Sequence, residues 1–429
     1  MSSQKPALAE FSGCLALMLI SGFLPLLKID GLDFPAALSL GYGGLLLLLR
    51  DAHVKTLNPA LTLVDMFRSQ IETGAALMII LSQFAGAAVG AFLLSVLTTG
   101  SNASIPASAA AAAAAAGPLL IPQLVFGAAL VFAYIRGNDG SVYEGPWLAA
   151  LMYGAFSIGG NATAFLNPAV ALGANVYRGI SGASTDAAAI AAVVGVPLAA
   201  AAVAFILDKI SEENLQTSEL IGAFFLSFGL LAAASNSSSS SSTSAAAVGF
   251  AFYAAAIVRM VAPASGGSLN PAVTGGAILS EGQRISKDLV VVWGYQLCGA
   301  AAAALLLSQV YASPAAAAAA TTAGDWRPVL QTIGLSALLL ISYCSNMGDF
   351  FGSPAAAFVG AVYGLSLLGG SGWLPINPAV SLAAAAAAAA AAAPLNLLET
   401  AAQVVLPFLG CIFGAVLLRL VPSEYKRRL

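Results

Sequence analysis

The sequence predicts an all-α integral membrane protein made of two homologous halves, and three observations support this. Of its 429 residues, 59% are hydrophobic and only 8% are charged, whereas soluble proteins carry about 25% charged residues. Long runs such as residues 73–97 and 398–421 contain almost no charge, and about 20 apolar residues cross a bilayer as a helix. The tripeptide Asn-Pro-Ala also occurs four times at nearly even spacing, which indicates an internal repeat.

The composition argues against catalysis, metal binding and nucleic-acid binding. The four cysteines stand singly inside apolar runs, in a spacing that suits neither a metal site nor a disulfide framework. Because His53 is the only histidine, a catalytic triad or a histidine-rich metal site is hard to build. No basic tract points to nucleic acid, and the N-terminus lacks the features of a secretory signal. We therefore expect no enzyme activity, cofactor or metal, and a first apolar run (residues 15–27) that is retained as a helix.

The Asn-Pro-Ala tripeptide marks an internal duplication. Its four copies begin at Asn58, Asn167, Asn270 and Asn377. They are separated by 167 − 58 = 109, 270 − 167 = 103 and 377 − 270 = 107 residues. The flanking sequences match the first copy with the third and the second with the fourth. "SQFAGAAVGAFLL" and "YQLCGAAAAALLL" share Gln-x-x-Gly-Ala, and "LMYGAFSIGG" is similar to "AVYGLSLLGG". The predicted halves are residues 1–209 and 210–429.

An Asn-Pro-Ala segment is suited to begin a helix. Proline at the first helical position needs no amide donor and has its φ angle preset, and the preceding asparagine can cap the helix. The roughly ten apolar residues of each segment are too few to span a bilayer. Each segment is therefore predicted to form a half-helix that starts inside the membrane beside a water-filled path. The alternative, a simple loop turn, explains one copy well and four copies poorly.

Two such half-helices that meet at their N-termini would form a pore site. Their positive dipole ends would repel cations, and the asparagine amides would donate hydrogen bonds to a neutral solute. The paired repeats predict that Asn58 lies close to Asn167 and that Asn270 lies close to Asn377. The predicted pore residues are Asn58, Pro59, Ala60, Asn167, Pro168, Ala169, Asn270, Pro271, Ala272, Asn377, Pro378 and Ala379.

These motifs resemble those of the aquaporin, or major intrinsic protein, family. The most specific stretch is "SGGSLNPAVT" at residues 265–274. The family's acid in helix one is matched by Glu10 and Glu219, and its Gln-x-x-Gly in helix three by Gln83 and Gln296. With four motifs, the chain resembles two aquaporin units in tandem. The resemblance implies six transmembrane helices and two re-entrant half-helices in each unit, related as inverted repeats.

The resemblance fails at the family's outer filter. The family's second motif normally continues with an arginine, but Val170 and Val380 stand at those positions. Family spacing places the other filter residues at Leu38, Ala155 and Ala164 in the first unit and at Phe250, Leu365 and Leu374 in the second. An apolar ring without arginine offers a solute no hydrogen bonds and can gate by dewetting. The alanines predict a wider first pore.

Two functions from different classes fit these residues. The first is a passive membrane channel for small uncharged solutes such as water, glycerol-like polyols, urea or a gas, which the four intact motifs favour. The second is a non-conducting, aquaporin-like structural subunit of a larger membrane complex, which the missing arginines favour. A secondary transporter is disfavoured because no acid or base pair inside the membrane indicates ion coupling.

The basic residues predict the orientation of the chain. In the inferred topology, thirteen of the sixteen lysines and arginines fall on the side of both termini, and Lys28, Arg178 and Arg327 fall on the other. The positive-inside rule then places the termini in the cytoplasm or its equivalent. Beyond the lipid bilayer, the partners left open are a second copy of the chain, giving a dimer with four units, and other subunits of a membrane complex.

Overall fold

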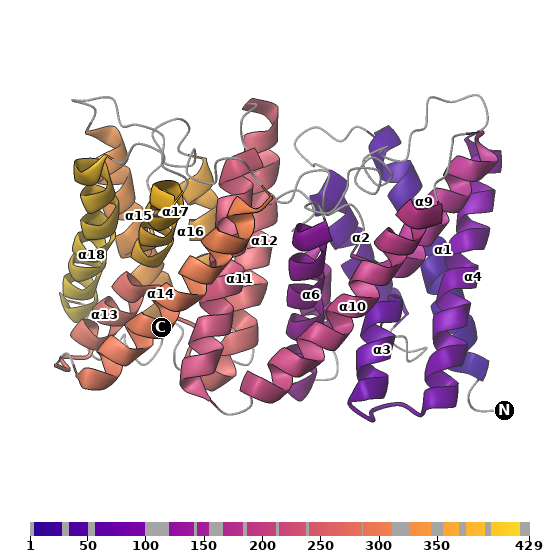
Figure 1. Ribbon diagram of the computed structural model, residues 1–429, viewed down its shortest axis with the longest axis horizontal. Coiled ribbons are helices and arrows are strands. Elements are labelled where there is room, and N and C mark those ends of the chain that lie inside the picture. Colours follow the sequence, from indigo (N-terminus) through magenta and orange to yellow (C-terminus); the bar gives the residue numbers. More distant parts are fainter. Residues whose placement is uncertain are drawn as a thin grey trace. The chain divides into compact units, whose positions relative to one another are not determined.

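The computed structural model describes fourteen ranges of the chain, and within them all regular structure is helical (Figure 1). The chain divides into two compact units, Met1–Ile210 and Ser211–Leu429. The described ranges are 4–27, 34–49, 56–98, 120–140, 144–153, 166–182, 187–211, 214–236, 240–284, 286–310, 326–344, 355–368, 375–390 and 396–420.

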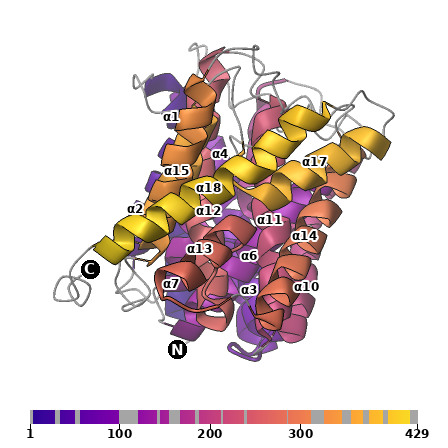
Figure 2. The ribbon, with the colours of Figure 1, turned by 90° about the vertical axis from the view of Figure 1, so that its left-hand side faces the viewer.

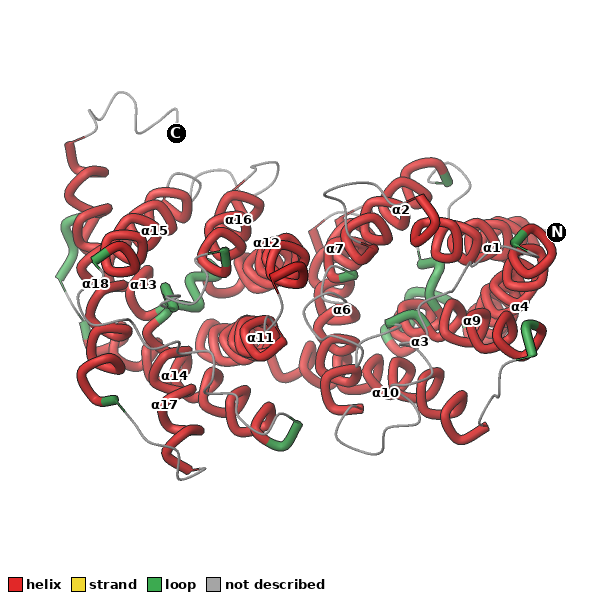
Figure 3. The backbone as a smooth tube through the Cα atoms, turned by 90° about the horizontal axis from the view of Figure 1, so that it is seen from above, coloured by secondary structure: helices red, strands yellow, loops and turns green. Residues whose placement is uncertain are grey.

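The helices of the first unit include two short ones that begin at Asn-Pro-Ala motifs. The long helix α1 packs against α4, and α4 also contacts the half-helix α9. The half-helices α3 and α9 meet within this unit, as Figure 3 shows. The helices are α1 (Gln4–Leu27), α2 (Phe34–Leu48), α3 (Pro59–Phe67), α4 (Thr73–Leu97), α6 (Leu120–Gly140), α7 (Glu144–Met152), α9 (Pro168–Ile180) and α10 (Ala187–Ser211).

The second unit repeats much of this order. Its first helix α11 packs against α14, as α1 does against α4, and the half-helices α13 and α17 again contact each other. Figure 2 shows α13 and α17 beside α14 and α18, which they contact. The helices are α11 (Leu215–Asn236), α12 (Ser240–Ser265), α13 (Pro271–Ser280), α14 (Lys287–Ser308), α15 (Arg327–Cys344), α16 (Ala355–Leu367), α17 (Pro378–Ala390) and α18 (Leu397–Leu420).

Nine helices in the described ranges are long and apolar enough to cross a membrane. They are α1, α4, α6, α10, α11, α12, α14, α15 and α18. The described parts of α2, α7 and α16 have 15, 9 and 13 residues, which is shorter than a span. Many large apolar side chains on the long helices are exposed, including Leu77, Met78 and Leu81 of α4. Exposed leucines in this number are expected where helices face lipid rather than water.

Glycines permit the closest helix contacts in both units. A Cβ atom on Gly86 of α4 would lie 2.2 Å from the backbone oxygen of Phe11, and one on Gly299 of α14 would lie 2.3 Å from that of Leu220. These glycines end the Gln-x-x-Gly pattern that the two halves share. Small residues let helix backbones approach each other in membranes. The pattern therefore brings Gln83 and Gln296 close to the first helix of each unit.

Candidate pore site

Each half-helix begins at its Asn-Pro-Ala motif, as the sequence predicts. In α3, the side-chain oxygen of Asn58 accepts a hydrogen bond from the backbone N–H of Ala60 at 2.9 Å. Asn167, Asn270 and Asn377 accept equivalent bonds from the second residue of α9, α13 and α17 at 2.9–3.0 Å. Because proline occupies the first helical position, no backbone donor is lost there. Each asparagine oxygen is thus used for capping, and its amide nitrogen remains available to donate.

The amide nitrogens join the two half-helices of the first unit. Asn58 Nδ2 donates to the backbone oxygen of Leu166 at 3.2 Å, and Asn167 Nδ2 donates to that of Leu57 at 2.7 Å. The exchange is reciprocal, because each asparagine bonds to the residue that precedes the other. The predicted pairing of Asn58 with Asn167 is therefore confirmed.

The second unit has the same arrangement. Asn270 Nδ2 donates to Ile376 O at 2.9 Å, and Asn377 Nδ2 donates to Leu269 O at 3.0 Å. The predicted pairing of Asn270 with Asn377 is confirmed as well, and each unit holds its own pair. All four asparagines are buried, with at most 1% of their surface exposed.

The residues before the first asparagine of each pair have a strained backbone. Leu57 has a φ angle of 46° and Leu269 one of 51°. A left-handed conformation is disfavoured for a leucine, because its Cβ crowds the backbone. The conformation turns the carbonyl group of each leucine toward the asparagine of the opposite half-helix, which bonds to it. The strained conformation thus accompanies the hydrogen bond that joins the two half-helices.

Buried glutamates hold these strained segments in place. Glu10 Oε2 accepts from the backbone N–H of Leu57 at 2.7 Å and from Gln83 Nε2 at 2.8 Å. Glu219 Oε2 accepts from Leu269 N at 3.0 Å and from Gln296 at 2.7 Å. These four residues stand where the family resemblance implies the acid of helix one and the Gln-x-x-Gly pattern. In the structure they contact the leucine segments and hold the backbone of these segments in position.

Tyrosines complete both asparagine sites, and they are absent from the predicted pore residues. Tyr153 and Tyr363 are buried, and their hydroxyl oxygens accept hydrogen bonds from Asn58 Nδ2 at 3.1 Å and Asn270 Nδ2 at 3.2 Å. The signal that could have found them is the Tyr-Gly pair shared by "LMYGAFSIGG" and "AVYGLSLLGG". A tyrosine in an apolar helix is usually read as core, because its ring buries a large apolar area.

The predicted filter residues lie in different environments. Val170 and Val380 are buried in the first turns of α9 and α17, and Leu38 in α2 and Phe250 in α12 are buried as well. Their role in a constriction stays a prediction. The other assignments fall on Ala155, Ala164 and Leu374, which lie outside the described residues.

Leu365 has a different placement from the buried filter candidates. It is 46% exposed, as is much of Phe358 on the same helix and of Leu368, which directly follows α16. Tyr363, two residues earlier, bonds to Asn270. Because successive helical residues are turned by about 100°, Leu365 points away from the asparagine pair. Its role in the constriction stays a prediction.

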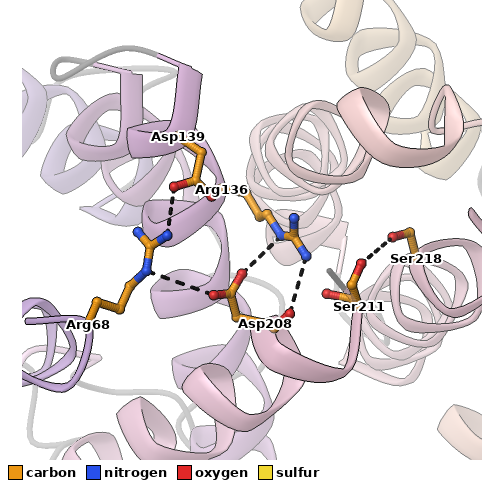
Figure 4. Close-up of polar contacts among 6 residues, drawn as sticks. All are labelled: Arg68, Arg136, Asp139, Asp208, Ser211 and Ser218. Atoms are coloured by element: carbon orange, nitrogen blue, oxygen red, sulfur yellow. Dashed lines mark hydrogen bonds and ion pairs between the residues drawn. The ribbon is translucent and has the colours of Figure 1, made fainter. Parts of the chain in front are cut away.

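A cluster of charges secures the far end of α3 in the first unit (Figure 4). Arg68, which follows α3, pairs with Asp139 of α6 at 2.7 Å and with Asp208 of α10 at 3.8 Å. Arg136 pairs with the same Asp208 at 3.2 Å. The side chain of Asp208 is buried and lies between the two guanidinium groups, as Figure 4 shows. In the second unit, Arg419 of α18 instead donates to the backbone oxygen of Leu279 in α13.

The apolar helices and the paired half-helices define a multi-pass integral membrane protein. Residues 213–421 match the model of the family described as Major intrinsic protein. This range includes every helix of the second unit. No curated protein matches the chain. Residues 213–421, just under half of the chain, are thus similar to the major intrinsic protein family, the aquaporins, whose members are membrane channels for small solutes rather than enzymes.

Proposed function

We propose that the chain is a tandem of two aquaporin-like units, each a passive channel for small uncharged solutes. The observation that carries this proposal is the reciprocal asparagine pair found in each unit. In the first unit it joins α3 to α9, and in the second it joins α13 to α17. A membrane protein that buries four capped half-helices around such pairs has the elements of two pores, including one in the unit before residue 213.

The half-helices would favour neutral solutes over ions. Their N-termini meet at the asparagine pair, and the N-terminus of a helix carries a positive partial charge. Cations and protons are repelled at such a point, whereas a neutral molecule with an oxygen atom can accept hydrogen bonds. The substrate class is therefore small and uncharged, with water, glycerol-like polyols, urea and dissolved gases as the candidates.

The outer constriction would act through its apolar character. Val170 and Val380 occupy the positions where the resemblance implies an arginine, and we place Leu38 and Phe250 beside them in their respective units. An apolar ring narrows the choice of solute by dewetting rather than by hydrogen bonding. We therefore expect a low rate of conduction. We also expect the outer constriction itself to discriminate little between solutes by charge.

Reconstitution of the full chain into liposomes tests the proposal. Stopped-flow light scattering would measure shrinkage in response to gradients of an impermeant osmolyte, glycerol and urea. We expect permeability to at least one of these above that of protein-free vesicles, and no conductance to monovalent ions. Permeability equal to that of protein-free vesicles for water and for every solute would count against the channel.

A second candidate function is a non-conducting structural subunit of a membrane complex. The observations that favour it are the hydrogen bonds from Asn58 to Tyr153 and from Asn270 to Tyr363, which take up amide donors that a solute would need. This role would place other subunits, or a second copy of the chain, around the two units. Absence of flux together with stable co-purification of other membrane subunits is the result that would favour it.

A further inference from the structure

The amide of Asn58 has its two hydrogens taken up by the protein. A side-chain amide nitrogen carries two donors. One donor of Asn58 goes to Leu166 O at 3.2 Å and the other to the Tyr153 hydroxyl at 3.1 Å. In the second unit, Asn270 donates to Ile376 O at 2.9 Å and to the Tyr363 hydroxyl at 3.2 Å. In this state neither asparagine has a hydrogen left for a solute.

The tyrosine hydroxyl lies near both asparagine side chains of each pair. Tyr153 accepts from Asn58, and the side chain of Asn167 also approaches the same hydroxyl. Tyr363 has the same relation to Asn270 and Asn377. This is the position that a solute oxygen would occupy while crossing the site, because it is where both amides can reach one acceptor.

Aromatic side chains of the second helix brace both tyrosine rings. The ring of Tyr42 in α2 lies 4.8 Å from that of Tyr153 between centroids, and the Tyr42 hydroxyl donates to the backbone oxygen of Thr56. Phe250 in α12 meets the Tyr363 ring edge-on at 6.1 Å. Paired aromatic rings in such geometries stabilise each other. The tyrosines are thus held in place by hydrogen bonds at one end and by ring contacts along the side.

We propose that Tyr153 and Tyr363 are plug residues, whose hydroxyl groups take the place of the solute at the asparagine pairs and hold both pores closed there. The inference rests on the proposed channel function. A solute that crosses must displace the hydroxyl and accept the hydrogen bond that it gives up. Water and polyols carry a hydroxyl that can do so, whereas an apolar gas cannot. The plug therefore selects solutes with an acceptor oxygen over apolar gases.

Flux through tyrosine variants in liposomes tests the plug. Tyr153→Ala, Tyr363→Ala and the double variant remove the ring and its hydroxyl, and we expect water and glycerol permeability to rise about tenfold or more over the wild type. Tyr153→Phe and Tyr363→Phe keep the ring in the path and should give a smaller rise. Flux in the alanine variants that equals a measurable wild-type flux would overturn the plug and leave the channel function standing.

A matched control uses a tyrosine away from the pair. Tyr253 in α12 is fully buried, and its hydroxyl donates to the backbone oxygen of Phe225. Tyr253→Phe and Tyr253→Ala make the same chemical changes outside the site and should leave flux unchanged. A rise with Tyr253→Ala as large as with Tyr363→Ala would show a general loosening of the unit and overturn the plug.

A measurement that does not depend on flux tests the plug hypothesis separately from the channel function. In Tyr153→Cys, a neutral reagent such as methyl methanethiosulfonate should modify the new thiol, which mass spectrometry would detect at residue 153. Modification without flux in any variant would support the plug and contradict the channel function. No modification and no change in flux would overturn the plug. Helix content and a single gel-filtration peak would establish that each variant is folded.

Discussion

At the residue scale, the strained leucines explain why each unit buries a glutamate. The left-handed conformation of Leu57 and Leu269 costs about 1–3 kcal/mol for each non-glycine residue. A buried carboxylate that bonds the backbone N–H of the leucine offsets this cost. The leucine carbonyl is then fixed for the asparagine of the opposite half-helix. In each half of the chain, the glutamate, the leucine and the asparagine therefore depend on one another.

The two glutamates should respond differently to the same substitution. Both oxygens of Glu10 accept hydrogen bonds, Oε1 from Thr56 and Oε2 from Leu57 and Gln83. Glu10→Gln would set an NH2 group against these donors, and leaving a buried donor unsatisfied costs about 1–3 kcal/mol. We expect a clear fall in the thermal midpoint of the detergent-solubilised protein.

Glu219→Gln is the comparison for that experiment. The donors on Glu219 reach Oε2, and its Oε1 has no hydrogen-bond partner among the described residues. A glutamine can therefore place its oxygen at the Oε2 position and turn its NH2 group to the other side. The midpoint should fall less than in Glu10→Gln. Equal falls in both variants would show that loss of charge, rather than donor geometry, sets the effect.

The asparagine pairs could be predicted from the sequence, but the tyrosines could not. The pairs follow from the period of the repeat and from the capping chemistry of Asn-Pro. The direction of the Tyr153 hydroxyl depends on how its helix is rotated toward the pair, which an apolar run does not reveal. The role of Leu365 in the constriction depends on the rotation of its helix in the same way, because the residue lies on an exposed part of α16.

At the element scale, the close packing of α1 against α4 and of α11 against α14 depends on one glycine in each unit. Gly86 faces a backbone oxygen of α1, and Gly299 faces one of α11. These contacts place Gln83 and Gln296 against the buried glutamates. If these helices moved apart, the glutamine would lose its contact with the glutamate. The glutamate would then hold the leucine segment less firmly. The long helices could be predicted from apolar runs, whereas such contacts depend on how the helices cross.

Two glycines of α14 provide a test of this contact within one helix. Gly299→Ala would bring a Cβ to 2.3 Å from Leu220 O, and overpacking of this kind costs about 1–3 kcal/mol. Gly294 has no atom within 4 Å of the Cβ position, so Gly294→Ala should stabilise the helix by up to about 1 kcal/mol. Thermal unfolding would measure both, and a gain in stability from Gly299→Ala would contradict the packing described for α14.

At the scale of the whole molecule, the repeated order of elements links the two units. Each unit begins with a helix that bears a buried glutamate and contains two half-helices with a reciprocal asparagine pair. This repeated order of elements could be predicted from the period alone. The differences could not, because the charge cluster around Asp208 and the bond from Arg419 to Leu279 join residues far apart in the sequence.

The inferred number of spans predicts where the linker between the units lies. Each unit is expected to have six spans, so the chain returns to its starting side before residue 216. Residues 208–216 and the C-terminal residues 426–428 should therefore both face the cytoplasm. Protease sites inserted at each position, in sealed vesicles of known orientation, would report this. Cleavage of the two sites from opposite sides would refute the expected topology.

The reciprocal asparagine bonds also constrain the order in which the protein can fold during synthesis. The carbonyl of Leu57 receives its bond from Asn167, which is made 167 − 57 = 110 residues later. At about 5–20 residues per second, a ribosome needs on the order of 5–20 s to add that length. Until then, α3 lacks the partner that holds its N-terminus inside the membrane. We therefore expect each chain to pass through two stages of synthesis in which a half-helix waits for its partner, one for every pair.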